Sequence, residues 1–113
     1  AERELKAARR AAARALILVE GHYSMDGDVP DLAGFVRLAR AHDAWLMVDD
    51  AHGLGVVGAT GRGVFEAAGV DPAEVDIWMG TLSKTLCACG GYITGRAELI
   101  DWLRHTAPGF VYS

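Results

Sequence analysis

The sequence predicts an α/β fold built on a mostly parallel sheet that is covered by helices. Three short apolar runs, at residues 16–19, 45–48 and 77–80, each end in polar residues and are typical of buried strands. From Asp31 to about His42, apolar residues recur at helical spacing. A strand, a helix and a second strand at this spacing form a right-handed βαβ unit, so the first two strands are expected to be parallel.

The segments before and between these strands predict further helices. Residues 2–14 are alanine-rich with a thin apolar stripe, which predicts an amphipathic helix. Residues 16–19 are continuously apolar, and we expect that strand to be buried on both faces. Residues 64–68 predict a short helix that stops at Gly69, and a capped turn follows at Asp71-Pro72-Ala73-Glu74.

The last third of the chain predicts one more strand and one more helix. Residues 91–94 follow the third strand too closely for a helical crossover, so this fourth strand is expected to run antiparallel to the others. The final helix is marked by Leu99, Ile100 and Leu103.

Composition restricts the class of protein. The 113 residues can form one domain, or part of one, and the net charge of −4 argues against a nucleic-acid surface. No apolar run reaches the length of a membrane span, and the first residues lack the pattern of a signal peptide. We therefore expect a cytoplasmic protein with no membrane or nucleic-acid partner. Cys87 and Cys89 are too close for an unstrained disulfide and lack a histidine for a zinc site, which predicts reduced thiols and no metal.

Polar residues follow each predicted parallel strand. Because the carboxyl ends of parallel strands lie along one edge of the sheet, these residues are expected to meet there. They are Glu20 and Ser24 after the first strand, Asp49, Asp50 and His52 after the second, and Thr81, Ser83 and Lys84 after the third.

Lys84 is the candidate reactive group of this set. A lysine at the end of a strand can be held neutral and nucleophilic and can then form a Schiff base. Pyridoxal phosphate (PLP) requires such a lysine, an acid beside its ring nitrogen, a donor to its phenolic oxygen and polar groups around its phosphate. These residue types are supplied by Lys84, Asp49, His52, Thr81 and Ser83. Residue types alone leave three alternatives: Lys84 as an ordinary surface lysine, Lys84 as the structural ion-pair partner of Asp49, and His52 as a core histidine.

Four motifs, in order along the chain, closely resemble the α-oxoamine synthases. They are VEGHYSMDGD at residues 19–28, MVDDAHG at 47–53, GATGRG at 58–63 and GTLSK at 80–84. The resemblance implies the fold of the aspartate-aminotransferase (fold type I) PLP enzymes. It also implies a PLP-dependent acyltransferase that condenses a small α-amino acid with an acyl thioester, usually with decarboxylation, to give an α-amino ketone.

The resemblance also implies roles for individual residues. Lys84 matches the Schiff-base lysine, Asp49 the partner of the pyridine nitrogen, and His52 with Ser24 the donors to the phenolic oxygen. Thr81 matches the phosphate-binding threonine. We expect Lys84, once released by substrate, to move the α-proton.

The sequence departs from the family at two positions near the predicted site. Cys87 and Ala88 stand where many relatives have glycine or serine, and a positive φ at Cys87 would cost about 1 kcal/mol. His22 stands at a position that is usually apolar in the family.

The relatives implied by the motifs are several times longer than this chain. We therefore expect residues 1–113 to be the middle of the PLP-binding large domain, without the earlier segment and the C-terminal small domain. The resemblance further implies a homodimer with shared active sites, in which the segment near Ser113 approaches the phosphate of the neighbouring subunit. Taken alone, the 113 residues are expected to be neither active nor a stable monomer.

Other functions remain as alternatives. A nucleotide-driven motor would need a G-x-x-x-x-G-K-[ST] loop, and the sequence contains none. The remaining alternatives are another fold type I PLP enzyme, such as an aminotransferase or a lyase, and a non-catalytic fragment of the same fold.

Overall fold

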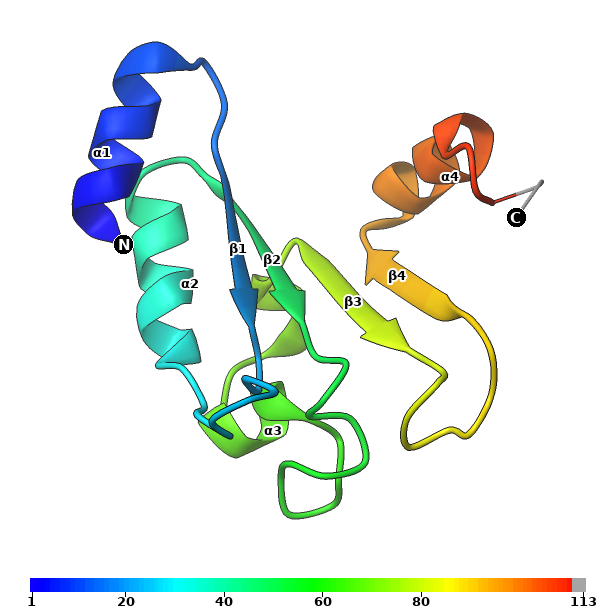
Figure 1. The fold of residues 1–113 in the computed structure, drawn as a ribbon. Helices are drawn as coiled ribbons and strands as arrows, with labels where there is room; N and C mark the ends of the chain where they lie inside the picture. The colour runs from blue at the N-terminus through cyan, green and yellow to red at the C-terminus, as the bar shows by residue number, and fades with distance from the viewer. Residues whose placement is uncertain (111–113) are drawn as a thin grey trace.

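The computed structural model describes residues 1–110, and the segment around Ser113 lies outside them. Helices and strands alternate along the chain as the sequence predicts (Figure 1). The helices are α1 (Glu2–Ala11), α2 (Leu32–Ala41), α3 (Val64–Ala68), the 3₁₀ turn η1 (Pro72–Glu74) and α4 (Ala97–Thr106). The strands are β1 (Leu16–Glu20), β2 (Trp45–Asp49), β3 (Ile77–Thr81) and β4 (Gly91–Gly95).

The described strands form one sheet in the order β1-β2-β3-β4. β1 pairs with β2 and β2 with β3 in parallel, whereas β4 pairs with β3 in antiparallel orientation, as predicted. The register places Glu20 opposite Asp49 and Asp49 opposite Met79. The carboxyl ends of the three parallel strands therefore lie side by side at one edge of the sheet.

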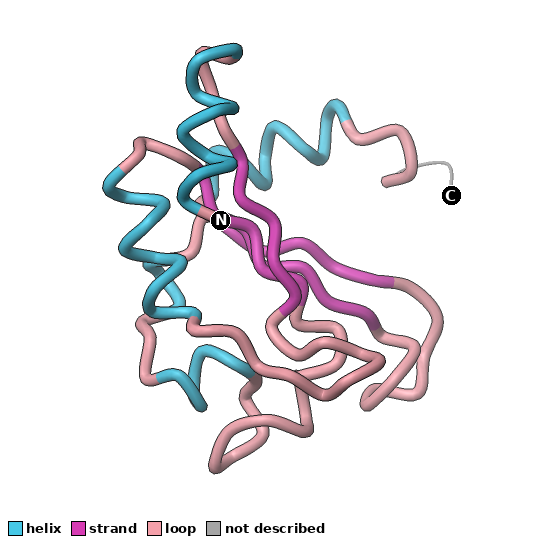
Figure 2. The backbone as a smooth tube through the Cα atoms, turned by 60° about the vertical axis from the view of Figure 1, so that its left-hand side comes forward, coloured by secondary structure: helices cyan, strands magenta, loops and turns pink. Residues whose placement is uncertain are grey.

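One face of the sheet carries the hydrophobic core. Val19, Leu46 and Val48 are at most 3% exposed and belong to the same buried cluster as Leu32 and Val36 of α2. Each such side chain contributes about 2 kcal/mol on removal from water. Figure 2 shows α2 and α3 on this side of the strands, and α4 packs against β4.

The other face of β1 is bare in this structure, so the prediction that residues 16–19 are buried on both faces is wrong. Leu16 and Leu18 are 51% and 61% exposed, and their neighbour Trp45 is 45% exposed. Successive strand residues point to opposite faces, and α2 covers only the face that bears Ile17 and Val19. α4 lies beside β4 at the opposite edge of the sheet from β1 (Figure 1).

Local signals explain the ends of the covering helices. Asp31 caps α2 by accepting the backbone N–H of Gly34 at 2.9 Å. α3 ends at Gly69, which adopts the left-handed conformation (φ 63°) that favours glycine. α1 ends at Ala11, earlier than the predicted Arg14, and it joins the end of α2 through the ion pair between Arg9 and Asp43.

No helix within residues 1–110 is long and apolar enough to cross a membrane.

Candidate active site

Asp49 and Thr81 end neighbouring parallel strands and share one face of the sheet. Asp49 lies opposite Met79, and Thr81 follows Met79 by two residues, so both side chains emerge on the face that also bears Met47. Asp49 is half-buried, and its Oδ1 accepts the N–H of Ala51 at 3.0 Å. This bond orients the carboxylate at the point where β2 ends.

Thr81 organises the loop that carries Lys84. Its Oγ1 lies 2.7 Å from Oγ of Ser83 and donates to the carbonyl of Gly90 at 3.1 Å. It also accepts the N–H of Ser83 at 3.2 Å. The two hydroxyls therefore form a hydrogen-bonded pair at the end of β3.

Lys84 projects from the same loop and is exposed. The salt bridges found among residues 1–110 do not include one between Lys84 and Asp49. The turn after Lys84 closes through the N–H of Cys87, which donates to the Lys84 carbonyl at 3.0 Å. Cys87 has φ of 50°, so this turn places a residue with a side chain in the positive-φ region.

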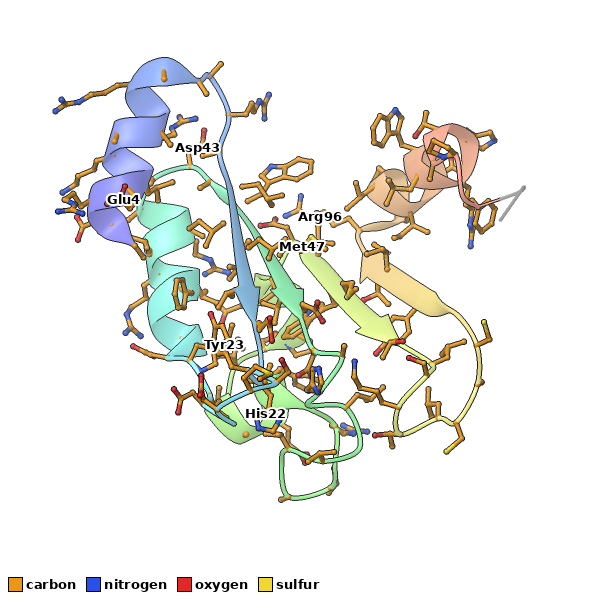
Figure 3. The ribbon with its side chains drawn as sticks, in the orientation of Figure 1. Glu4, His22, Tyr23, Asp43, Met47 and Arg96 are labelled. Atoms are coloured by element: carbon orange, nitrogen blue, oxygen red, sulfur yellow. The ribbon has the colours of Figure 1, made fainter. Side chains whose placement is uncertain are left out.

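Side-chain hydrogen bonds join the loops that follow the three parallel strands. His22, after β1, lies with Nδ1 3.3 Å from the carbonyl oxygen of His52, after β2. The hydroxyl of Thr85, after β3, donates to the carbonyl of Leu54 at 2.8 Å. Figure 3 labels His22 at the end of the molecule where these loops gather. The structure therefore brings the segments bearing His52 and Lys84 together.

Ser24 lies in the loop after β1 and is exposed, and its side chain makes no hydrogen bond within the described part of the chain. Its backbone neighbours are ordered by a turn in which Gly27 N–H donates to the Tyr23 carbonyl at 2.8 Å. The ring of His52 is partly buried rather than enclosed in the core, which argues against the core-histidine alternative.

Asp50, which the sequence placed at this edge without a role, is a buried carboxylate. It is 6% exposed, and its Oδ2 accepts the N–H of Val64 at 3.1 Å. Oδ1 has no hydrogen-bond partner within the described residues. Burial raises the pKa of Asp50, the Val64 N–H lowers it in part, and the charge of Asp49 raises it further.

Glycines make the space that Asp50 occupies. A Cβ added at Gly21, Gly53 or Gly63 would meet its carboxylate, and Gly63 also has φ of 102°. Asp50 therefore packs between the end of β1, the loop after His52 and the start of α3, and it is hydrogen-bonded to the last of these. The signal available in the sequence was a second acidic residue beside Asp49, surrounded by glycine-containing motifs.

Glu66 was not singled out from the sequence, and it organises the glycine-rich loop at residues 58–63. It accepts the hydroxyl of Thr60 at 2.7 Å and the N–H of Arg62 at 3.1 Å. The hydrogen bonds from the Thr60 hydroxyl and N–H hold the pKa of Glu66 below its usual value. This loop returns the chain from His52 to α3.

The larger hollows of the surface lie away from these polar residues. One, of about 570 Å³, runs between β4 and α4 and is lined by Met79, Ile93 and Leu103. Another, of about 610 Å³, is bounded by Trp45, Leu99 and Trp102. Both are lined mainly by apolar side chains.

A parallel sheet with a lysine, a carboxylate and paired hydroxyls at its carboxyl edge defines a candidate PLP-type site. The chain belongs to the aminotransferase class I and II family, whose model matches residues 1–113. Within this family its relatives are α-oxoamine synthases, which confirms the resemblance seen in the motifs.

Two curated relatives illustrate the similarity. The chain is 50% identical over 105 residues to serine palmitoyltransferase 3 of Homo sapiens, a match that covers 93% of this chain and 19% of the human protein. It is 47% identical over 112 residues to the 8-amino-7-oxononanoate synthase of Petrotoga mobilis, covering 99% of this chain and 28% of that protein. The chain thus spans 19% and 28% of the length of these two relatives.

Solved structures share the fold as well as the sequence. A serine palmitoyltransferase of Sphingomonas wittichii matches with a TM-score of 0.85 and 38% identity, over 99% of this chain and 28% of that one. A structure described as SPT with the PLP internal aldimine matches with a TM-score of 0.83 and 30% identity, over 100% of this chain and 29% of that one. These neighbours confirm the predicted fold class.

Proposed function

We propose that residues 1–113 are the central part of the PLP-binding large domain of an α-oxoamine synthase. Such an enzyme condenses a small α-amino acid with an acyl thioester, carried by coenzyme A or by a carrier protein, usually with decarboxylation, to give an α-amino ketone. The observation that carries the proposal is the placement of Asp49, Thr81 and Lys84 at one edge of the sheet, in a chain 50% identical to a serine palmitoyltransferase.

The residues at this edge fit PLP by their chemistry. A half-buried carboxylate, a partly buried imidazole and two hydroxyls 2.7 Å apart lie on segments that hydrogen bonds hold together. When bound, PLP supplies an electron sink that stabilises negative charge at the α-carbon of the amino acid.

Each residue then has a task of its own. Asp49 would pair with the ring nitrogen and keep it protonated, because a carboxylate favours the cationic form of its partner. Thr81 and Ser83 would hold the phosphate, while His52 and Ser24 would donate to the phenolic oxygen. Lys84 would hold the cofactor through its amino group and, when free, would move the α-proton.

The assembly and location complete the proposal. We expect a cytoplasmic homodimer with shared active sites and with amino acid and acyl thioester substrates. Cys87 and Cys89 are exposed free thiols, which is in keeping with a reducing compartment. The exposed apolar residues Leu16, Leu18 and Trp45 provide surface for further chain to cover.

A second candidate is another fold type I PLP enzyme, an aminotransferase or a lyase. The family model that matches the chain is that of the class I and II aminotransferases, which favours retaining this candidate. A non-catalytic fragment of the fold is the third possibility, and it predicts no covalent attachment of PLP.

The test is to label the cofactor lysine in the full-length source protein. After incubation with PLP, borohydride reduction and peptide mapping should place the pyridoxyl group on Lys84, and a Lys84→Ala variant should remain unlabelled. Adding glycine, alanine or serine with an acyl thioester should then release coenzyme A or carrier thiol and form an amino ketone.

Other results would redirect the assignment. Label on Lys6 would contradict the role of Lys84, and absence of label would favour the non-catalytic fragment. Conversion of the amino acid to a keto acid without thiol release would favour an aminotransferase.

A further inference from the structure

His22 has no part in the proposed chemistry, yet it contacts the segment that carries His52. It lies two residues after Glu20, the last residue of β1, and it is partly buried. Its Nδ1 lies 3.3 Å from the carbonyl oxygen of His52. The contact therefore links the loop after β1 to the backbone of a proposed site residue in the loop after β2.

The position from which His22 extends is closely fixed. The N–H of Gly21 donates to the carbonyl of Asp49 at 2.7 Å and continues the pairing of β1 with β2. A Cβ at Gly21 would lie 2.7 Å from both Oδ1 of Asp50 and Cγ1 of Val64, so the backbone at this point is enclosed by two other segments. The imidazole of His22 thus starts from an anchored backbone.

The ring orientation follows from the chemistry of its partner. A carbonyl oxygen only accepts hydrogen bonds, so Nδ1 of His22 must carry the proton and donate. The opposite nitrogen, Nε2, faces the turn at Gly27, where an added Cβ would lie 3.7 Å away. The turn itself is closed by the N–H of Gly27, which donates to Tyr23 at 2.8 Å. The ring therefore lies between this turn and the backbone of His52.

We infer that His22 is a positioning residue that holds the backbone of His52, and with it the His52 imidazole, in place beside the cofactor site. Fixing the carbonyl of a residue restricts the peptide plane next to it and so the direction in which its side chain leaves the backbone. The inference rests on the proposed function in one respect, the role of His52 beside the cofactor. The hydrogen bond between His22 and the His52 carbonyl does not require bound PLP.

The test compares two substitutions at position 22 in the full-length protein. His22→Leu keeps an apolar body of similar size and removes the donor, whereas His22→Asn places an amide N–H close to the position of Nδ1. One hydrogen bond of this kind changes an equilibrium by about twofold to tenfold. The dissociation constant for PLP, measured by absorbance titration of the apoprotein, should rise by about that factor in His22→Leu, and His22→Asn should restore it.

Kinetics provide a second readout. In His22→Leu, kcat should fall by about twofold to tenfold while the KM for the amino acid stays within twofold, because a displaced His52 affects the cofactor more than amino acid binding. The matched control is His105→Leu. Nδ1 of His105 lies 2.8 Å from the Asp101 carbonyl within α4, remote in sequence from the strand ends, so its loss should change neither value.

A measurement without cofactor separates this inference from the proposed function. Nitrogen-15 NMR of histidine-labelled apoprotein should show His22 protonated at Nδ1, and the His52 signals should move in His22→Leu but not in His105→Leu. Equal PLP affinity in His22→Leu and the wild type would overturn the inference. A weakened PLP affinity in His22→Leu that His22→Asn does not restore would overturn it as well. If Lys84 is not labelled by PLP but the NMR result holds, the proposed function fails and the His22 contact stands.

Discussion

The hydroxyl of Thr85 donates a hydrogen bond of 2.8 Å to the carbonyl of Leu54. Thr85 directly follows Lys84, and Leu54 lies two positions after His52. This bond therefore joins the two loops that carry these proposed cofactor residues. A Cβ at Gly55 would meet the side chain of Thr85, which shows how closely the loops approach.

Removing this hydroxyl should loosen the lysine loop. Thr85→Val keeps the shape of the side chain and leaves the Leu54 carbonyl without its donor, which should lower the free energy of unfolding by about 1 kcal/mol and reduce turnover. Thr106→Val is the control, because Thr106 donates to the Trp102 carbonyl at 2.8 Å within α4. Chemical denaturation and kcat should show a comparable loss of stability in both variants and a loss of turnover only in Thr85→Val.

Asp49→Asn should retain part of the PLP binding but lose most turnover. A neutral amide does not hold the ring nitrogen protonated, so stabilisation of the carbanion should fall by about 3 kcal/mol, or roughly a hundredfold in kcat. Steady-state kinetics together with labelling of Lys84 check this result. Unchanged kcat with full labelling would mean that Asp49 serves only the structure through its bond to Ala51.

Asp50 should make stability rise as the pH falls. Burial raises its pKa above the ordinary value of 3.8, so the folded state binds the proton more tightly than the unfolded state does. Above the raised pKa, the ionised carboxylate therefore costs stability. As the pH falls from neutrality through the raised pKa toward 3.8, the unfolding free energy of the wild type should rise relative to Asp50→Asn.

Glu66 provides a control of opposite sign for the same denaturation series. Its pKa is lowered by the hydrogen bonds from Thr60, so its contribution is present above the ordinary carboxyl pKa and is lost as the pH falls through the lowered value. The wild type should therefore lose stability relative to Glu66→Gln on acidification. Parallel trends for Asp50→Asn and Glu66→Gln would contradict the assignment of Asp50 as a buried, poorly solvated carboxyl.

Cys87→Gly should stabilise the loop after Lys84. Cys87 has φ of 50°, a conformation that costs a side-chain-bearing residue about 1 kcal/mol and costs glycine little. Cys89 is not among the residues with positive φ, so Cys89→Gly should give no such gain. Thermal unfolding of the two variants of the full-length protein distinguishes them, and equal changes would show that strain at Cys87 is not relieved.

Residues 1–113 expressed alone should self-associate and should bind no PLP covalently. Leu18 and Trp102 are each 61% exposed, and Leu16 lies at the unpaired edge of the described sheet with 51% exposure. Apolar surface next to an unpaired strand favours association with other chains. Sedimentation, cofactor absorbance and thermal unfolding test this expectation. A monomer with a cooperative transition and covalently bound PLP would contradict it.

Short-range patterns in the sequence determined the class of fold and the order of its elements. The apolar runs, the helical spacing after Asp31 and the glycine at position 69 each act within a few residues, so they predict strands, a helix and a helix end without knowledge of the rest. The short link between β3 and β4 predicted their antiparallel pairing. Asp49, Thr81 and Lys84 could be assigned to strand ends in the same way, because each follows an apolar run within a few residues.

Only the tertiary structure decided which groups meet across those ends. The contact of His22 with His52 and the burial of Asp50 between Gly21 and Gly63 join segments that are far apart in the sequence, and no local pattern encodes such a pairing. The exposure of Leu18 was decided in the same way. A run of apolar residues shows that a strand is apolar on both faces. Whether each face is buried depends on where the helices pack, and the described helices leave the face of β1 that bears Leu18 exposed.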